Sequence, residues 1–384
     1  MRDVSITGVG LHKFGRFPHK TIEEIGQEAV SRALADAVNL DWKKVQVAFC
    51  GTMHGGTAVG QRVLAHIGLT GIPVTNVETA CASGGSALKL AFQSVASGEY
   101  DIALALGIEK AGSGYLALNS YPQWQHLSGM GIPPVQLGLT ATRYMIDHGA
   151  TMQHLAKVAV KNRKNASLNP NAIHQKPTTM ERVLEARMVN YPFTVLMLAS
   201  PCEGAAAVII TPKIASLKYN SVPITIAAAC TGVAQYGTDF CGMSSGFETD
   251  STRIRNPEVT TILSQQAYNI AGVGPEDLDL LELNDSTAAS EIILIEELGI
   301  CKEGEGIRLV DEGRTEIGGD IAVSTSGGLL GMGEPVGAVG IAQAVEIVYQ
   351  LREQAGNRQV PGARIGMCQS AGAGGNCTVT ILKR

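Results

Sequence analysis

The sequence is poor in charged and aromatic side chains and has no long apolar run. Only 17% of its 384 residues are charged, 5% are aromatic, and the formal net charge is −5. A chain of this charge offers no general electrostatic attraction to nucleic acid or to acidic membrane surfaces. No apolar run approaches the roughly 18 residues of a membrane span, and no signal-peptide pattern follows Met1. We therefore expect a cytoplasmic globular protein without nucleic-acid or membrane partners.

The eight cysteines include no Cys-x-x-Cys pair. That spacing is the usual mark of a zinc site or a redox dithiol, so we expect neither, and no metal site is assigned. The Gly-x-Gly patterns at 8–10 and 331–333 lack the third glycine of a dinucleotide-binding loop. What the chain does have is glycine, 45 residues of it, which suits close packing of helices on sheets.

Cys81 is the most informative cysteine. It lies in the segment NVETACASGGSAL at 76–88, between a β-rich run at 72–77 and a helical pattern that opens with small residues. Unpaired N–H groups and the positive end of a helix dipole favour the thiolate, which is the nucleophilic form. The alternative is a buried structural cysteine, the more common state of a lone thiol. The junction and the glycines favour the nucleophile.

The two halves of the sequence echo each other. The run that begins at Ile6 resembles the run that begins at Ile226, and the segment 77–81 resembles 323–327. Each half predicts a strand, a helix, a second strand, a small-residue strand-to-helix junction, a long helix and closing strands. Alternating helices and strands of this kind indicate an α/β fold.

An insertion separates the halves. It begins with a loop-like stretch rich in glycine and proline, and helical patterns follow near 138–145, 152–166 and 179–188. Its segment at 157–164, KVAVKNRK, is basic within an acidic chain. Such a run is usually a solvated helix face. The functional alternative is a seat for the anionic tail of a cofactor.

At this point the chain resembles a thiolase, most closely the sterol-carrier-protein type and its bacterial and archaeal relatives. The resemblance covers nearly the whole chain and is carried by several short motifs together. These are GQR at 60–62, GIP at 71–73, CASGGSAL at 81–88, GIEK at 107–110, NPNA at 169–172 and EGAAA at 203–207, where the family usually has Asp before the Gly.

The resemblance implies a five-layer αβαβα fold of two pseudo-symmetric halves. The N-terminal half would comprise residues 1–112 and 202–220, and the C-terminal half residues 221–384. The insertion, residues 113–201, would be the loop domain that covers coenzyme A. The family also implies at least a homodimer, with acyl-CoA and CoA as substrates and no tightly bound cofactor.

The resemblance assigns roles residue by residue. Cys81 matches the nucleophile that becomes acylated. Cys368 opens CQSAGAGG at 368–375, which resembles the Cys-x-Gly loop of the acid–base thiol, with Ser370 in place of the Gly as a backbone donor to the oxyanion. Asn284 begins NDSTA and would hold a water that donates to the oxyanion. Asn284 is equally readable as a turn or as a helix cap.

The largest departure from the family is at 333–338, GEPVGA, where thiolases have Gly-His-Pro. Glu334 replaces the histidine. A carboxylate cannot donate to an oxyanion unless it is protonated, but a buried glutamate can have a pKa high enough to act as a base. The alternative is that His54, in TMHGG at 52–56, reaches the site from the first half. A histidine in such a loop is usually not catalytic.

We therefore predict a thiolase-type acyltransferase that cleaves or forms a 3-oxoacyl-CoA through an acyl-cysteine. Its substrate could be branched or aromatic, with benzoylsuccinyl-CoA as one candidate. Relatives suggest a small partner subunit with a zinc ribbon and an OB-fold. One rival is a carbon–carbon lyase that cleaves a β-hydroxyacyl-CoA by retro-aldol chemistry. The other is a non-catalytic protein that binds acyl-CoA or lipid on the same fold.

Overall fold

The computed structural model describes residues 1–110, 123–234 and 258–384. Within these ranges ten strands form one sheet, in the order β10-β9-β11-β12-β8-β1-β7-β4-β2-β3. The strands are β1 (Val4–Gly15), β2 (Val47–Gly51), β3 (Val74–Val77), β4 (Ala103–Glu109), β7 (Glu203–Pro212), β8 (Ile224–Val233), β9 (Leu280–Glu282), β10 (Ala322–Val323), β11 (Ile365–Gly372) and β12 (Asn376–Lys383).

The sheet consists of two five-stranded halves of the same design. The order β3-β2-β4-β7-β1 in one half matches β10-β9-β11-β12-β8 in the other. In each half the first two of these pairings are parallel and the third is antiparallel. The halves join where β1 pairs with β8 over only two residue pairs, Ser5–Thr225 and Ile6–Ile224. The internal repeat predicted from the sequence is therefore present in the topology.

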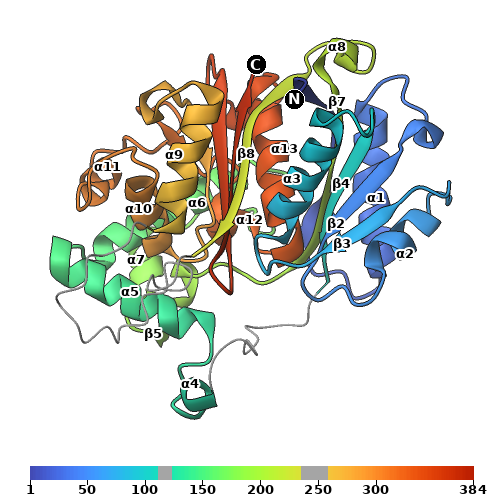
Figure 1. Ribbon diagram of the computed structural model, residues 1–384. Coiled ribbons are helices and arrows are strands. Elements are labelled where there is room, and N and C mark those ends of the chain that lie inside the picture. Colours follow the sequence, from blue (N-terminus) through green and yellow to red (C-terminus); the bar gives the residue numbers. More distant parts are fainter. Residues whose placement is uncertain (111–122, 235–257) are drawn as a thin grey trace.

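Helices cover and separate the two halves. Figure 1 shows α3 (Ser83–Ala96) and α13 (Val339–Leu351) between them, with α1 (Ile22–Asp36) and α2 (Val59–Ala65) on one outer face and α9 (Val259–Ala271), α10 (Ala288–Glu297) and α11 (Gly306–Asp311) on the other. The short helix α8 (Lys213–Ser216) follows β7, and the short helix α12 (Gly328–Met332) follows β10. The predicted five-layer αβαβα arrangement is confirmed.

Two early features show how the sequence builds these layers. A capping box starts α1: the Thr21 hydroxyl accepts from the Glu24 N–H, and the Glu24 carboxylate accepts from the Thr21 N–H. A Cβ on Gly8 or Gly10 of β1 would lie 2.3 or 2.1 Å from a carbonyl oxygen of α1. The Gly-x-Gly pattern therefore serves helix–sheet packing, as the missing third glycine suggested.

The central helices approach each other through glycine. A Cβ on Gly340 of α13 would lie only 2.5 Å from the backbone nitrogen of Gly85 in α3. Cys81 precedes α3, and Glu334 precedes α13. The close contact of the two helices therefore brings together two residues that are 253 positions apart in the chain, counted as 334 minus 81.

The insertion between β4 and β7 is mostly helical. It contains α4 (Gln123–Leu127), α5 (Pro133–His148), α6 (Met152–Ser167), α7 (Met180–Leu184) and a hairpin of β5 (Met188–Asn190) and β6 (Phe193–Thr194). Figure 1 shows its α4, α5, α7 and β5 at the lower left and its α6 behind β8. The helices predicted near 138–145 and 152–166 are present, and prolines that looked loop-like open α5. The helix predicted at 179–188 was too long, because β5 begins at Met188. The predicted domain boundary at 113 lies outside the described residues.

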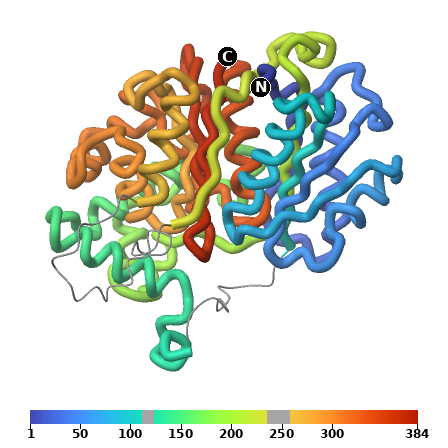
Figure 2. Tube along the Cα trace, viewed as in Figure 1, coloured from blue at the N-terminus to red at the C-terminus, as the bar shows by residue number. Residues whose placement is uncertain are grey.

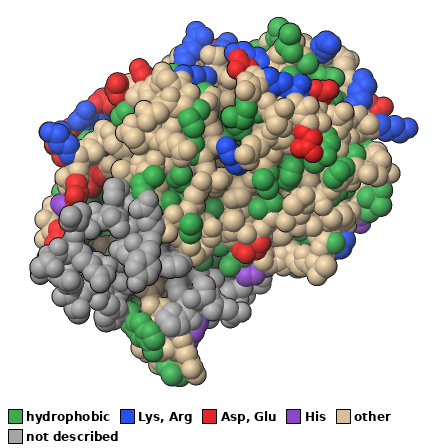
Figure 3. Space-filling view, viewed as in Figure 1, with side chains coloured by type: hydrophobic (Ala, Val, Ile, Leu, Met, Phe, Trp, Pro, Cys, Tyr) green, Lys and Arg blue, Asp and Glu red, His purple; other side chains and the backbone are tan. Residues whose placement is uncertain are grey.

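The surface and termini complete the picture. Lys383 of β12 and Ser5 of β1 both pair with Thr225 of β8, so the two ends of the chain lie close together (Figure 2). On the face drawn in Figure 3 hydrophobic side chains are scattered among polar ones. None of the helices in the described ranges has the length and apolar character needed to cross a bilayer.

Candidate active site

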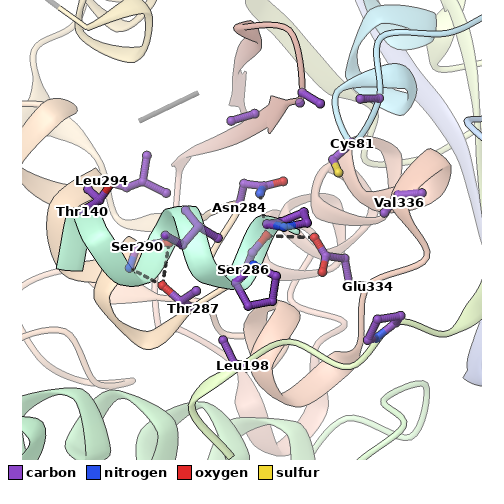
Figure 4. A pocket seen from close by; sticks show the side chains of 18 of the residues that line it. Cys81, Thr140, Leu198, Asn284, Ser286, Thr287, Ser290, Leu294, Glu334 and Val336 are labelled. Atoms are coloured by element: carbon purple, nitrogen blue, oxygen red, sulfur yellow. Dashed lines mark hydrogen bonds between the residues drawn. The ribbon is translucent and has the colours of Figure 1, made fainter. Parts of the chain in front are cut away.

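A cavity of about 180 Å³ lies where the two halves and the insertion meet, and Cys81 is in its wall. One end is polar and holds Cys81, Asn284, Ser286 and Glu334, which gather around a common space (Figure 4). From there the cavity follows one side of α10 toward Leu294 and Glu297. Apolar side chains line most of that length, namely Pro133, Pro134, Leu137, Leu198, Val259, Ile293 and Leu294.

Cys81 occupies a tight turn between β3 and α3. Ala80 has a left-handed backbone (φ 52°), which an L-residue adopts only when its surroundings hold it there. The turn is fixed by its own hydrogen bonds, because the Ala82 and Ser83 N–H groups donate to the carbonyls of Thr79 and Ala80. The half-buried thiol thus stands at the start of a 14-residue helix, as the sequence predicted.

A second loop presses against this turn. A Cβ on Gly372, at the end of β11, would lie 2.3 Å from the Thr79 carbonyl oxygen and 3.0 Å from the Cys81 nitrogen. Only glycine allows this approach. Ala371, Gly372 and Ala373 are the residues of the segment 368–375 that reach the cavity.

Cys368 does not reach it. The thiol lies within β11, opposite Thr380 of β12 and Glu282 of β9, and is 4% exposed. Burial and the Glu282 carboxylate raise the pKa of Cys368 to about 12, so it stays protonated at neutral pH. The prediction that two thiols converge on one pocket is therefore not met. Gly372, which meets the Cys81 turn, lies four residues after Cys368.

Ser370 is also outside the cavity wall. Its hydroxyl is buried and donates to the Gln343 side chain at 2.7 Å. It lies in the antiparallel ladder opposite Thr378 of β12. The structure thus does not bring Ser370 to the oxyanion position expected from the Cys-x-Gly resemblance, and residues 371–373 occupy that side of the cavity instead.

A hydrogen-bonded row connects Asn284 with Glu334. The Asn284 amide donates to the Ser286 hydroxyl at 3.0 Å, and that hydroxyl donates to the Glu334 carboxylate at 2.8 Å (Figure 4). The buried Oδ1 of Asn284 has no partner among the described residues. Asn284 and Glu334 are brought together as predicted, and Ser286 is a member that sequence reasoning missed. The sequence signal for Ser286 was that it is a polar residue only two positions after Asn284.

Two backbone hydrogen bonds fix the position of Glu334. Its N–H donates to the Ser200 carbonyl at 3.0 Å, and its own carbonyl accepts from the Cys202 N–H at 3.4 Å. Gly333 before it has a left-handed φ of 108°. Burial raises the pKa of Glu334 to about 7, although the Ser286 hydrogen bond opposes that shift. Near neutral pH this carboxyl can both accept and release a proton.

His54 lies in the wall of the same cavity, but it is exposed. The backbone N–H groups of His54 and Met53 donate to the two carboxylate oxygens of Glu109, each at 3.0 Å. Glu109 is fully buried, and burial raises its pKa. Glu109 also lines the cavity, whereas its motif, GIEK at 107–110, did not identify it as a site residue. No hydrogen bond links His54 with Glu334 in the described part of the chain.

Comparison with known proteins identifies this arrangement. Residues 4–177 match the family "Thiolase, N-terminal domain", and residues 251–384 match "Thiolase C-terminal domain-like". The chain belongs to the thiolase family. The resemblance stated from its motifs is thereby confirmed, and so is the prediction of an enzyme of the thiolase type of acyltransferase.

Several curated proteins are similar to this chain over nearly its full length. Acetyl-CoA acetyltransferase of Methanothermobacter thermautotrophicus is 37% identical over 395 residues, with all of both chains covered. Sterol carrier protein 2 of Bos taurus is 34% identical, over 99% of this chain and 72% of that protein. Benzoylsuccinyl-CoA thiolase subunit BbsB of Thauera aromatica is 34% identical, over 97% and 95%.

Two solved structures share the fold of this thiolase. The "Ltp2-ChsH2(DUF35) aldolase" superposes with a TM-score of 0.86 at 25% identity, covering 99% of this chain and 97% of that one. Human mitochondrial 3-ketoacyl-CoA thiolase superposes with a TM-score of 0.73 at 16% identity, covering 100% and 98%. The second likeness supports the fold alone.

Proposed function

We propose that this thiolase cleaves, or in reverse forms, a 3-oxoacyl-CoA through an acyl-Cys81 intermediate. The Cys81 thiolate attacks C3, the C2–C3 bond breaks, and its electron pair leaves as the enolate of the shorter acyl-CoA, which takes up a proton. The CoA thiol then loses its proton and attacks the acyl group, which restores Cys81. In this proposal coenzyme A is a substrate, and the reaction uses no tightly bound cofactor.

In this proposal Glu334 moves the protons. It is the titratable group beside Cys81 whose pKa of about 7 suits both directions of transfer. In its protonated form Glu334 gives a proton to the enolate. In its ionised form it accepts the proton of the incoming CoA thiol. The unpartnered Oδ1 of Asn284 would accept from a water whose other hydrogen donates to the oxyanion. Glu334 thereby replaces both the missing histidine and the Cys368 thiol.

We propose a branched or aromatic acyl group as the substrate. The apolar wall along α10 supports this, because it extends well beyond what a two-carbon acyl group fills. The similarity to a benzoylsuccinyl-CoA thiolase subunit makes benzoylsuccinyl-CoA a concrete candidate. Activity on acetoacetyl-CoA that exceeds activity on aryl and branched 3-oxoacyl-CoAs would contradict this choice.

The test of the mechanism is mass spectrometry of the Cys81 peptide after incubation with 3-oxoacyl-CoA and a rapid acid quench. We expect the acyl mass on Cys81. Cys202 provides an internal control in the same cavity, because burial raises its pKa and keeps the thiol protonated. Turnover with an unmodified Cys81 peptide would overturn the acyl-enzyme.

A retro-aldol lyase is the second candidate. The position of Cys368 outside the cavity and the likeness to an aldolase favour it. Here Glu334 removes the proton of the 3-hydroxyl of a β-hydroxyacyl-CoA, the C2–C3 bond breaks, and the enolate is protonated. This route needs neither free CoA nor a nucleophile, so Cys81→Ser retains activity. Thiolysis instead consumes one CoA per turnover and is abolished by Cys81→Ser.

We further propose a small partner subunit with a zinc ribbon and an OB-fold. The solved complex of a similar chain with ChsH2(DUF35) supports this proposal. Homodimer formation and the cytoplasmic location stay predictions. Purification from native cells should yield a second, zinc-containing chain at constant stoichiometry. Full activity of the isolated chain on its substrate would count against the partner.

A further inference from the structure

The basic segment at 157–164 belongs to α6, and one of its four cations differs from the others. Each lysine forms an ion pair with a carboxylate of the C-terminal half, at nitrogen–oxygen distances of 2.6 to 2.8 Å. These pairs are Lys157–Asp311, Lys161–Glu291 and Lys164–Glu316. Arg163 has no such partner among the residues that the structure describes. The segment is therefore neither a plain solvated face nor fully neutralised.

Arg163 is a buried cation without an acceptor. The residue is only 8% exposed, and its guanidinium makes no hydrogen bond or ion pair with any residue that the structure describes. Its Nε is completely buried. A guanidinium carries five N–H donors in a fixed fork, and leaving a buried charged donor unpaired is costly. Such a side chain is expected to meet an anion.

The groups around Arg163 do not balance its positive charge. Burial and the neighbouring Arg182 of α7 lower the pKa of Arg163 to about 10, so it remains a cation at neutral pH, and no carboxylate of the described residues offsets that shift. His174 is neutral, because burial and Arg163 lower its pKa to about 4. The Arg182 guanidinium is likewise without a hydrogen bond or ion pair in the described ranges.

A further unpaired donor lies in the segment between His174 and α7. The hydroxyl of Thr178 is buried and has no partner among the described residues. Next to it, an open groove of about 580 Å³ is lined by Thr179, Arg182 and other residues of α7 and the following segment. This groove gives ions from solution access to the Arg182 guanidinium.

We propose that Arg163, Arg182 and Thr178 bind a phosphate-type oxyanion. Two guanidinium groups and a hydroxyl match the charge and the hydrogen-bonding capacity of a phosphate. The inference goes beyond the proposed function, since none of the three residues lines the cavity that holds Cys81. The phosphate comes either from free phosphate or from the phosphates of coenzyme A.

Hydrogen bonds connect the surroundings of Arg163 with Glu334 of the row Asn284–Ser286–Glu334. The Nε2 of His174 lies 3.0 Å from the Ser200 hydroxyl, and the Ser200 carbonyl accepts the Glu334 N–H at 3.0 Å. Binding at Arg163 therefore occurs on elements that also hold Glu334 in place. The phosphate contact is nevertheless independent of the reaction, and it stands even if the acyl-Cys81 chemistry is wrong.

Calorimetric titration of the full chain with inorganic phosphate tests the site. We expect Arg163→Met to weaken phosphate binding by about tenfold or more, because charge-assisted hydrogen bonds are lost. Arg187→Met, at an exposed arginine of the same insertion, should leave binding unchanged. Without phosphate, Arg163→Met should unfold at the same temperature as the wild type or a higher one, since it removes an uncompensated buried charge.

Absence of phosphate binding to the wild type, or equal binding to Arg163→Met, overturns the proposal. Should Arg163→Met fail to fold, Arg182→Met replaces it, with the same expected direction. Competition identifies the source of the phosphate. Displacement of phosphate by CoA but not by dephospho-CoA assigns the site to the 3′-phosphate of CoA, and no displacement by either assigns it to a free oxyanion.

Discussion

At the scale of single residues, the exchange of a histidine for Glu334 decides what the site can do. An imidazole donates to an oxyanion in its neutral form, whereas a carboxyl does so only when protonated. Burial at 7% exposure moves the pKa of Glu334 to about 7, which makes both forms accessible. The residue is therefore suited to proton transfer more than to permanent oxyanion stabilisation.

Glu334→Gln should lower turnover at least about a hundredfold, because the amide keeps the shape of the carboxyl but transfers no proton. It should also change stability with a definite sign. The pKa of Glu334 is raised in the folded state, so the folded chain binds more protons and its stability falls as pH rises through 7. The variant should be more stable than the wild type by up to about 3 kcal/mol near pH 8, and equal to it near about pH 4.

Denaturant unfolding at both pH values measures this difference. Glu99→Gln is the control, because Glu99 is exposed and the substitution there should leave stability unchanged at either pH. A Glu334→Gln protein that gains nothing at the higher pH would show that the carboxyl is not buried in its neutral form.

Ser286→Ala removes the hydroxyl that connects Asn284 with Glu334. The Ser286 hydrogen bond holds the pKa of Glu334 down, so its loss should raise that pKa further and move the corresponding limb of the kcat/KM profile to higher pH. Stability should fall by about 1 to 3 kcal/mol, since the Asn284 amide loses its partner. Ser286→Thr retains a hydroxyl and should keep the wild-type profile. An unmoved profile in Ser286→Ala would remove Ser286 from the site.

Single residues also show which parts of the site can be predicted from the sequence. Cys81 and Asn284 could be placed because each follows a strand at a junction whose residue pattern is local. Cys368 could not, because the residue that meets Cys81 is set by where β11 ends against its neighbours, a tertiary property. Arg163 looked like part of a solvated basic face, and only the packing of α6 reveals that it is buried without a partner.

At the scale of elements, the junction before α3 and the loop after β11 form one unit. Their contact requires Gly372, and the sequence offered only a glycine-rich run without indicating which glycine is in contact. The prolines at the start of α5 were similarly ambiguous, because proline both breaks a helix and opens one. Which of the two applies depends on the residues that follow.

Gly372→Ala should separate these two elements. Its Cβ would lie 2.3 Å from the Thr79 carbonyl oxygen, which must move and carry the Cys81 turn with it. We expect a strong loss of turnover and a destabilisation of about 1 to 3 kcal/mol. Gly232→Ala in β8 is the control, because its Cβ meets only the flexible Leu263 side chain, at 3.2 Å. Full activity of Gly372→Ala, measured on the same substrate, would show that the turn tolerates displacement.

At the scale of the whole molecule, the insertion is fixed to the C-terminal half by charge. Lys161 of α6 donates to Glu291 of α10 at 2.6 Å and to the Val323 carbonyl at 2.9 Å, and both charged side chains are almost fully buried. Asn162 adds hydrogen bonds to Glu291 and to Asp285, the residue after Asn284. The insertion therefore contacts the C-terminal half directly beside Asn284, where the hydrogen-bonded row to Glu334 begins.

Lys161→Met should unfold the chain more easily by about 3 to 5 kcal/mol, because it leaves the Glu291 carboxylate buried without its cation. Lys164→Met is a matched control on the same helix. The Lys164–Glu316 pair has a similar length, 2.8 Å, but its side chains are 61% and 45% exposed, so its loss should cost less than about 1 kcal/mol. Denaturant midpoints of the two variants compare them directly. If the two variants lost equal stability, the insertion would be held by apolar packing alone, and the buried charges between α6 and α10 would not fix its position over Cys81.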